Sequence, residues 1–219
     1  MTQELEQFAA GKYALSLHTT TPELGLAISN FAGEARSHIW DLGHDLSSYV
    51  HQYLIEFIKP QTWRDIAFIA VAKGPGGFTG TRIGVVIART LGQQLNIPVF
   101  AISTLAAVAW AEKAKNPPTP AVVAVEMPGQ RGKVFAAIYQ ISANHKGIKA
   151  LLPETVFTPE AWQETLASYQ GEYQLIKATS GLAATVNSIL ALAYLDWQQG
   201  KHPDWFEAIP YYGQHPVQN

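Results

Sequence analysis

A glycine-rich segment carries the residues of this chain most suited to holding a phosphate. It reads KGPGGFTG over positions 73–80 and follows an unbroken apolar run. Glycines permit positive φ angles and close approach of the backbone, and a following helix start offers unpaired amides that attract anions. The alternative is a tight strand-to-helix turn without a ligand, and the spacing fits neither a Walker A loop nor a dinucleotide fingerprint. The residues of this candidate anion or nucleotide loop are Gly74, Gly76, Gly77, Thr79 and Gly80.

A polar turn, His18 followed by Thr19, Thr20 and Thr21, ends the first apolar run of the chain. A nucleotide-bound magnesium ion needs oxygen ligands, and a carboxylate is the usual choice. His18 is a poor magnesium ligand, so we expect no autonomous ATP hydrolysis. The threonine hydroxyls could donate to a phosphate, but such hydroxyls more often bond to nearby backbone groups.

Other catalytic and metal-binding patterns are missing from the sequence. There is no cysteine, which excludes thiolate chemistry, and no Gly-x-Ser-x-Gly elbow. None of the seven histidines lies four residues from another, so the paired-histidine spacing of helical metal sites is absent. We expect no metal and no catalytic residue.

Composition describes a compact globular protein. Of 219 residues, 47% are hydrophobic and 15% charged, with a net charge of -2. Nucleic-acid binding depends on a surplus of Lys and Arg, so the chain alone should bind RNA weakly. The first twelve residues lack a basic, apolar secretion signal, and no apolar run approaches the ~20 residues of a membrane span. We expect a cytoplasmic protein that does not engage a membrane.

Periodicity predicts alternating strands and helices that position these two segments. The first half combines short apolar or alternating runs with stretches whose apolar residues recur at threes and fours. Its predicted strands are 13–17, 24–29, 36–41, 66–72 and 98–102, and its predicted helices 45–58, 81–95 and 104–115. Three prolines within 116–120 prevent helix and sheet alike and mark a domain junction.

The second half repeats the order of the first. Its predicted strands are 121–126, 134–140, 151–157 and 173–178, and its predicted helices 159–169 and 183–199. A βββαβα order that occurs twice predicts two α/β lobes of the actin-like, ribonuclease H-like class (ASKHA), over 1–115 and a smaller 116–219. The last helix is expected to pack back on the first lobe, and the tail from Lys201 to be partly loose.

The glycine loop carries a family resemblance. With the residues up to Gly84 it resembles the Gly-Pro-Gly-Ser-Phe-Thr-Gly-Leu-Arg-Ile-Gly stretch of the TsaB (YeaZ) family, with Gly77 and Thr81 as departures. The likeness covers the first lobe, although that family usually has Asp-Thr-Ser-Thr where this chain has His18 and the threonines. It is looser in the second lobe, around Glu126 and Arg131, and the tail lacks the family's arginine after Tyr211.

The resemblance implies a role in forming N6-threonylcarbamoyladenosine beside the anticodon of tRNA. It implies a non-catalytic subunit that binds and supports a homologous, metal-containing catalyst, TsaD, in an assembly regulated by the ATPase TsaE. Contact with tRNA would then occur only through the complex. ATP or ADP would bind only at a site shared between the two subunits.

The resemblance also places the partner contact on two antiparallel helices of the first lobe, 45–58 and 81–95. Both have apolar stripes wider than one sheet contact needs. On the residues alone, burial of the two helices under each other and the third helix explains these stripes equally well, whereas the resemblance favours a partner contact. The isolated chain is expected to pair with itself there. Tyr53→Asp or Val86→Asp should abolish association without unfolding the chain. The expected interface residues are Leu46, Tyr49, Val50, Tyr53, Leu54, Phe57, Arg82, Ile83, Val86, Ile87 and Thr90.

Two other functions stay open on the residues alone. One is a small actin-like kinase or ATPase that acts through the cleft near His18 and Gly76. The other is a tRNA-binding module, which should show a steep salt dependence that the net charge does not favour.

Overall fold

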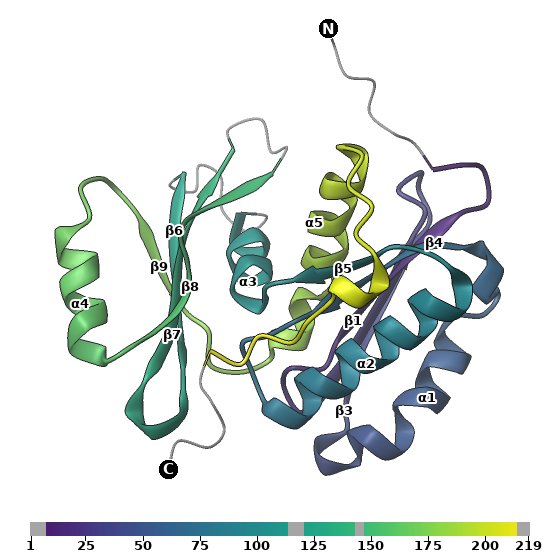
Figure 1. The fold of residues 1–219 in the computed structure, drawn as a ribbon, viewed down its shortest axis with the longest axis horizontal. Coiled ribbons are helices and arrows are strands. Elements are labelled where there is room, and N and C mark those ends of the chain that lie inside the picture. The colour runs from purple at the N-terminus through teal and green to yellow at the C-terminus, as the bar shows by residue number, and fades with distance from the viewer. Residues whose placement is uncertain (1–7, 114–120, 143–146, 214–219) are drawn as a thin grey trace, which may run out of the picture.

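The structure, a computed structural model, describes residues 8–113, 121–142 and 147–213. It contains two β-sheets, one in each half of the chain, with helices on the faces of both (Figure 1). From one side to the other the layers are α4, the second sheet, α3 and α5, the first sheet, and the pair α1 and α2 (Figure 1). The predicted α/β class with two actin-like lobes is confirmed.

The first sheet has the strand order β3-β2-β1-β4-β5. β2 is antiparallel to β1 and to β3, whereas β4 and β5 continue parallel to β1. The chain passes from β3 to β4 through α1, from β4 to β5 through α2, and then enters α3. The bounds are β1 Tyr13–His18, β2 Glu23–Ser29, β3 Ala35–Asp41, α1 Leu46–Phe57, β4 Ile66–Ala72, α2 Phe78–Leu95, β5 Val99–Ile102 and α3 Thr104–Lys113.

The second sheet repeats this plan in a smaller form, with the order β8-β7-β6-β9. β6 pairs antiparallel with β7 and parallel with β9, as β1 does with β2 and β4. The bounds are β6 Val122–Pro128, β7 Val134–Ile141, β8 Ile148–Phe157, α4 Pro159–Ser168, β9 Gln174–Lys177 and α5 Val186–Gln198. Short 3-10 helices occur at η1 Gly43–Asp45, η2 Trp63–Asp65, η3 Gln130–Gly132, η4 Leu182–Thr185 and η5 Trp205–Glu207.

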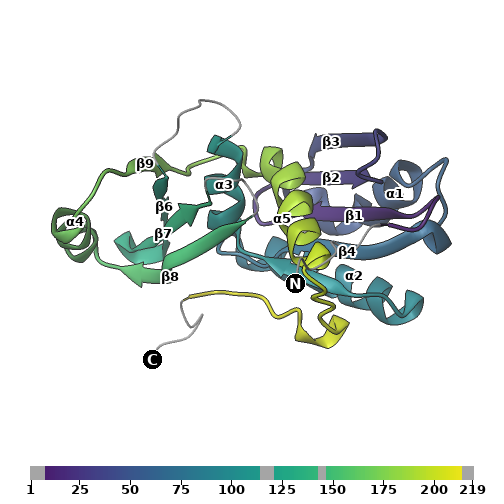
Figure 2. The ribbon, with the colours of Figure 1, turned by 90° about the horizontal axis from the view of Figure 1, so that it is seen from above.

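Burial follows the layers. β1 and β4 are buried without alternation because helices cover both faces of the first sheet, α1 and α2 on one side and α5 on the other. Figure 2 shows α5 crossing the face of the first sheet while α3 lies next to the second. The last helix of the chain therefore belongs to the core of the first lobe, where Ile189 is fully buried.

Three predicted starts differ by three residues, those of β8 at Ile148, α5 at Val186 and α2 at Phe78. α2 begins at Phe78, three residues before the predicted start, because Thr81 N already donates to Gly77 O at 2.9 Å. The tail was expected to be partly loose. Its described part is packed around η5, where Asp204 and Glu207 form a capping box and Ala208 is 1% exposed. The predicted domain junction at 116–120 and the last six residues lie outside the described residues.

Candidate functional site

The glycine loop is packed directly on the threonine turn. An added Cβ at Gly76 would lie 2.5 Å from Thr20 O, and one at Gly80 would lie 2.0 Å from Thr19 O. Neither distance is tolerable against backbone, so both positions require glycine. Gly74 has φ +103°, which also favours glycine. The loop is therefore built for close contact between the two segments.

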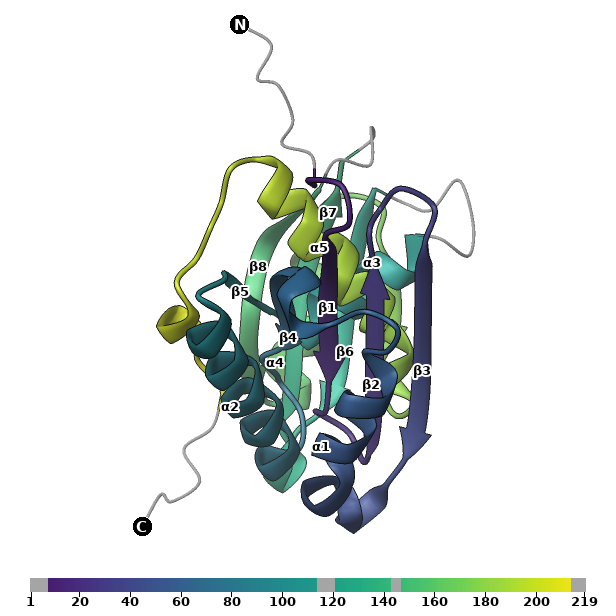
Figure 3. The ribbon, with the colours of Figure 1, turned by 90° about the vertical axis from the view of Figure 1, so that its right-hand side faces the viewer.

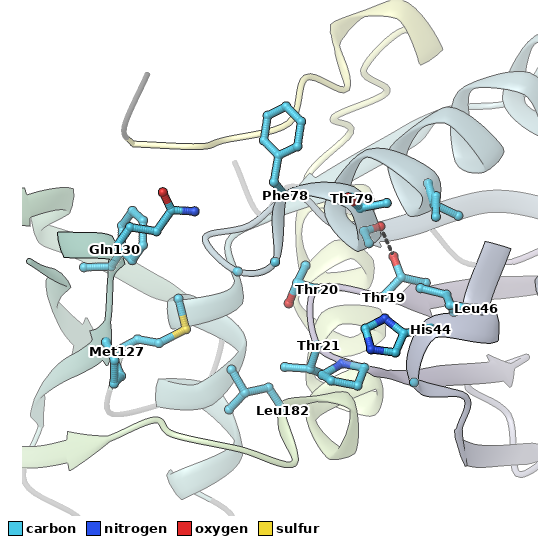
Figure 4. A pocket seen from close by; sticks show the side chains of 18 of the residues that line it. Thr19, Thr20, Thr21, His44, Leu46, Phe78, Thr79, Met127, Gln130 and Leu182 are labelled. Atoms are coloured by element: carbon cyan, nitrogen blue, oxygen red, sulfur yellow. Dashed lines mark hydrogen bonds between the residues drawn. The ribbon is translucent and has the colours of Figure 1, made fainter. Parts of the chain in front are cut away.

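The polar groups of the turn are used in this contact. Gly77 N donates to Thr20 O at 2.7 Å, and Thr19 Oγ1 donates to Gly80 O at 2.8 Å, as the dashed line in Figure 4 marks. Thr20 Oγ1 lies 3.4 Å from Thr104 Oγ1 at the start of α3. Thr19 and Thr20 thus bond within the protein, which is the alternative that favours a structural turn over a phosphate site. Thr21 also lines the cleft, and its Oγ1 has no hydrogen-bond partner among the described residues.

His18 is enclosed in the first lobe. Its side chain is fully buried, and neither ring nitrogen has a hydrogen-bond partner among the described residues. Burial penalises the charged imidazolium and lowers the pKa of His18 to about 3. A neutral imidazole that does not line the cleft cannot take the place of a carboxylate that holds magnesium.

A cleft of about 680 Å³ opens between the two lobes in front of this turn. One wall combines the threonine turn with the start of α1 and α2, and the other is the end of β6, with Met127 and Gln130 (Figure 4). The described residues that line it include no Asp, Glu, Lys or Arg. The cleft is large enough for a small molecule, but it offers neither a carboxylate for a metal nor a cation for a phosphate.

A polar cluster around Glu154 joins the two lobes. Lys73 Nζ, at the end of β4, lies 3.4 Å from Glu154 Oε1, and Tyr211 OH donates to Glu154 O at 2.7 Å. Tyr211 N in turn donates to Lys73 O, so the C-terminal segment bridges both lobes. Ser103 Oγ and Tyr139 OH, 3.2 Å apart, extend the cluster, and burial raises the pKa of Tyr139.

A groove of about 450 Å³ separates α1 from α2 on the outer face of the first lobe. Its walls come from both helices, and Trp63 closes one end. The two helices start together, since Leu46 lies beside Gly80, and run in the same direction (Figure 3). The predicted antiparallel arrangement is therefore wrong, because α1 and α2 each follow a strand that runs the same way in the sheet.

Four of the predicted interface residues are buried in the core of the first lobe. Leu46, Val50 and Leu54 are at most 5% exposed because they pack on the first sheet, and Ile87 is 8% exposed. They form the floor of the groove or lie beneath it. They offer little surface to a partner, and their part in the contact stays a prediction.

The three aromatic residues of α1 do not line the groove. Tyr53 and Phe57 pack against Trp40 of β3, with ring centroids 4.8 and 6.0 Å apart. They are half-buried, so Tyr53→Asp would disturb this packing as well as any contact. Tyr49 is 48% exposed but does not line the groove.

The groove instead presents a strip of α1 that sequence reasoning missed. Ser47, His51 and Ile55 recur every four residues and line the groove, opposite Ile83, Val86 and Thr90 of α2. Ile55 and Val86 are 54% and 53% exposed. The four-residue spacing was a visible signal, but the larger aromatic residues one helical face away obscured it.

Glu126, the second-lobe residue likened to a family aspartate, has structural partners. Its carboxylate accepts from Trp162 Nε1 at 2.7 Å and lies 3.3 Å from Lys177 Nζ. Trp162 is 1% exposed, so this bond satisfies a buried donor.

Metal-binding clusters and membrane-spanning helices are both absent from the part of the chain that the structure describes. Residues 8–113, 121–142 and 147–213 contain no cluster of three or more His, Asp or Glu side chains arranged to hold a metal. Over the same described ranges, every helix is too short or too polar to cross a membrane.

The chain is similar in sequence to a known family of proteins. Residues 50–195 match the family model described as TsaD, tRNA N6-adenosine threonylcarbamoyltransferase. The chain is 39% identical to the tRNA threonylcarbamoyladenosine biosynthesis protein TsaB of Bacillus subtilis over 77 residues, and 36% identical to that of Escherichia coli over 110 residues. These stretches cover 35% and 50% of this chain and 32% and 46% of the relatives, so the chain matches less than half of their length.

Solved structures agree over a longer range. YeaZ from Pseudomonas aeruginosa superposes with a TM-score of 0.72 at 22% identity, covering 92% of this chain and 99% of that one. Another P. aeruginosa protein, described as uncharacterized with similarity to peptidase YEAZ, gives a TM-score of 0.74 at the same 22% identity. It covers 93% of this chain and all of that one. At this identity the likeness establishes the fold.

Proposed function

The chain belongs to the TsaD family, in its TsaB (YeaZ) group, and from this we propose that it is a non-catalytic partner subunit in the formation of N6-threonylcarbamoyladenosine on tRNA. In this proposal it binds and supports a TsaD-like catalytic subunit through the groove between α1 and α2. The observation that carries the proposal is the groove itself, an apolar surface on the outside of the molecule with Ile55 and Val86 more than half exposed.

The groove is suited to another protein's helix. Its floor is the core of the first lobe, so it is rigid, and its rims come from two helices that run side by side. Exposed apolar side chains in one patch mark a contact surface when they gather in this way. An apolar ridge of a partner helix would fill the groove and remove Ile55, Val86 and Ile83 from water.

The cleft supports the non-catalytic part of the proposal. It has no lining carboxylate among the described residues, and His18, which takes the place of the family's usual aspartate in the sequence, is buried and does not line the cleft. Threonylcarbamoyl transfer is accordingly assigned to the partner subunit. ATP or ADP binds, in this proposal, only where the partner adds its own charged groups to the cleft.

The remaining partners follow from this arrangement. The net charge of -2 gives the chain little attraction for RNA, so tRNA is met through the complex. A TsaE-like ATPase acts on the assembly and not on this chain alone. Without its partner, the exposed groove pairs with a second copy, which gives a homodimer in solution.

The test is a binding titration with a TsaD-like subunit from the same cell. Ile55→Asp and Val86→Asp each place a carboxylate in the groove, and burial of that charge should weaken binding at least 100-fold, on the order of 3 kcal/mol. Leu151→Asp is the matched control, since Leu151 is 40% exposed but lies on β8 of the second lobe. Wild-type affinity in both groove variants would refute the placement of the contact.

The alternative, a small actin-like ATPase or kinase, rests on the volume of the cleft. Calorimetry of the isolated chain with magnesium and ATP separates the two functions. The partner-subunit proposal expects no turnover and no micromolar binding, because the cleft supplies no charged ligand. Steady ATP hydrolysis by the purified chain would favour the enzyme.

A further inference from the structure

We propose that the docking face continues across α2 onto the C-terminal segment, where a strip of two arginines and two apolar residues receives an acidic, apolar surface of the same partner subunit. The strip consists of Arg82 and Arg89 of α2 with Phe206 and Ile209 of the C-terminal segment. This inference rests on the proposed function, because it assigns the strip to the partner that fills the groove.

The most exposed large hydrophobic side chains lie on α1, α2 and the C-terminal segment. Among the described residues, the large hydrophobic side chains that are more than half exposed are Ile55, Val86, Phe206 and Ile209, at 54%, 53%, 53% and 64%. The first two line the groove, and the last two lie in or just after η5. In Figure 3, α1, α2 and the short yellow helix η5 lie side by side on one face, with α2 in the middle. The elements that carry these four side chains therefore adjoin one another.

The C-terminal segment is fixed to α2 and is not a loose tail. A Cβ on Gly92 would lie 3.0 Å from Trp205 Cβ, so the absence of a side chain at Gly92 lets η5 approach the helix closely. Tyr212 packs on Phe78 at the start of α2, with ring centroids 4.6 Å apart. Ala208, between the two exposed residues, is 1% exposed and anchors the segment in the core. A partner would therefore meet a preorganised surface and lose little conformational entropy on binding.

The charges of the strip indicate what kind of surface fits it. Over Phe78–Leu95 the sequence contains Arg82 and Arg89 but no Asp, Glu or Lys. Arg82 lies over the ring of Phe78 at 4.4 Å, and Arg89 over that of Trp205 at 5.8 Å. Within the described residues neither guanidinium forms an ion pair. Two preoriented guanidinium groups beside exposed apolar side chains call for carboxylates on the partner.

The same charges disfavour a second copy of this chain as the occupant. In a two-fold dimer that pairs α2 with α2, each arginine would face another α2, which offers no carboxylate. Glu207, the carboxylate of η5, accepts from Asp204 N at 2.9 Å and is engaged in its capping box. The strip therefore strengthens the contact with an acidic partner and adds nothing to self-pairing.

The small area of the groove face supports an interface that also includes the strip. Helix α1 has 12 residues and is about 18 Å long, and two adjacent helices are about 20 Å wide, so the groove face covers roughly 400 Å². A stable interface of standard size needs about 800 Å² from each partner. The groove alone is too small, and the strip is the neighbouring apolar surface that supplies the rest.

The experiment measures two affinities for each variant, one for the TsaD-like subunit by titration and one for self-association by sedimentation. Arg82→Glu with Arg89→Glu should weaken binding to the partner at least 10-fold in 0.1 M salt, with a smaller difference in 0.5 M salt because ions screen the pairs. Self-association should not weaken. Lys149→Glu, which reverses an exposed charge on β8, is the matched control.

A second variant guards against a folding effect of the arginine changes. Ile209→Ser with Phe206→Ser leaves both guanidinium stacks in place and should also weaken the partner contact at least 10-fold, with Leu151→Ser as control. If both strip variants bind like the wild type while Val86→Asp does not bind, the strip is not part of the interface and the proposed function stands. If Val86→Asp and Ile55→Asp also bind normally, the proposed function fails with it.

Discussion

Acidification should destabilise this protein through His18, which is buried without a hydrogen-bond partner. Its pKa in the folded state is about 3, against 6.5 for an exposed imidazole. Between these two values the unfolded chain binds a proton at this position and the folded chain does not. Stability from the neutral imidazole is therefore complete above pH 6.5 and is lost as the pH falls toward 3.

The magnitude follows from the same shift. Lowering the pH from about 7.5 to about 5.5 should reduce the free energy of unfolding by roughly 1.4 kcal/mol through His18 alone. The change is isolated by comparing wild type with His18→Leu in urea titrations at both pH values, since contributions from other groups cancel in the difference. The free energy of unfolding of His18→Leu, relative to that of the wild type, should therefore be roughly 1.4 kcal/mol higher at pH 5.5 than at pH 7.5.

The same comparison contains its control. At pH 7.5 the His18 imidazole is neutral in both states, so the gap between His18→Leu and wild type there measures only the change in packing, and the change in that gap at pH 5.5 reports the proton. The reasoning is refuted if the gap between His18→Leu and wild type stays constant between the two pH values. That outcome would mean that His18 takes up a proton in the folded protein.

Two further changes test the packing that shapes the cleft. Gly80→Ala should lower the free energy of unfolding by about 2 kcal/mol, because the new Cβ would lie 2.0 Å from Thr19 O. Gly147→Ala, whose new Cβ would have no atom within 4 Å, should leave stability unchanged in the same denaturation assay. Equal stabilities of the two variants would show that the loop can move away from the threonine turn. Tyr211→Phe removes the bond to Glu154 O and should cost about 1 kcal/mol in thermal unfolding, and an unchanged melting temperature would mean that the bond does not hold the lobes.

Most of the fold could be predicted because the local pattern and the tertiary environment agree. The unbroken apolar run of β4 indicated a strand covered on both faces, and helices do cover both. The start of α2 was misplaced because glycine and phenylalanine are weak helix formers. Tertiary contact with the threonine turn, which no local pattern reveals, fixes that first turn.

The site was harder to predict for the same reason. Periodicity finds the apolar face of α1 but cannot divide it between the sheet, β3 and the groove. Val50 faces the sheet, Tyr53 faces Trp40 and Ile55 faces the groove, and the sequence shows all three as apolar positions of one helix. Arg82 was among the expected interface residues, but the part of the strip after α5 was beyond sequence reasoning, because Trp205 and Arg89 are brought together only by the path of the chain after α5.

In the function proposed above, this chain serves tRNA modification by docking a partner through the groove. The most direct measurement is the N6-threonylcarbamoyladenosine content of tRNA, by mass spectrometry of nucleosides, from cells depleted of this protein and supplied with wild type, Val86→Asp or Leu151→Asp. We predict that wild type and Leu151→Asp restore the modified nucleoside and that Val86→Asp, present at equal level, does not. Full restoration by Val86→Asp would contradict the account.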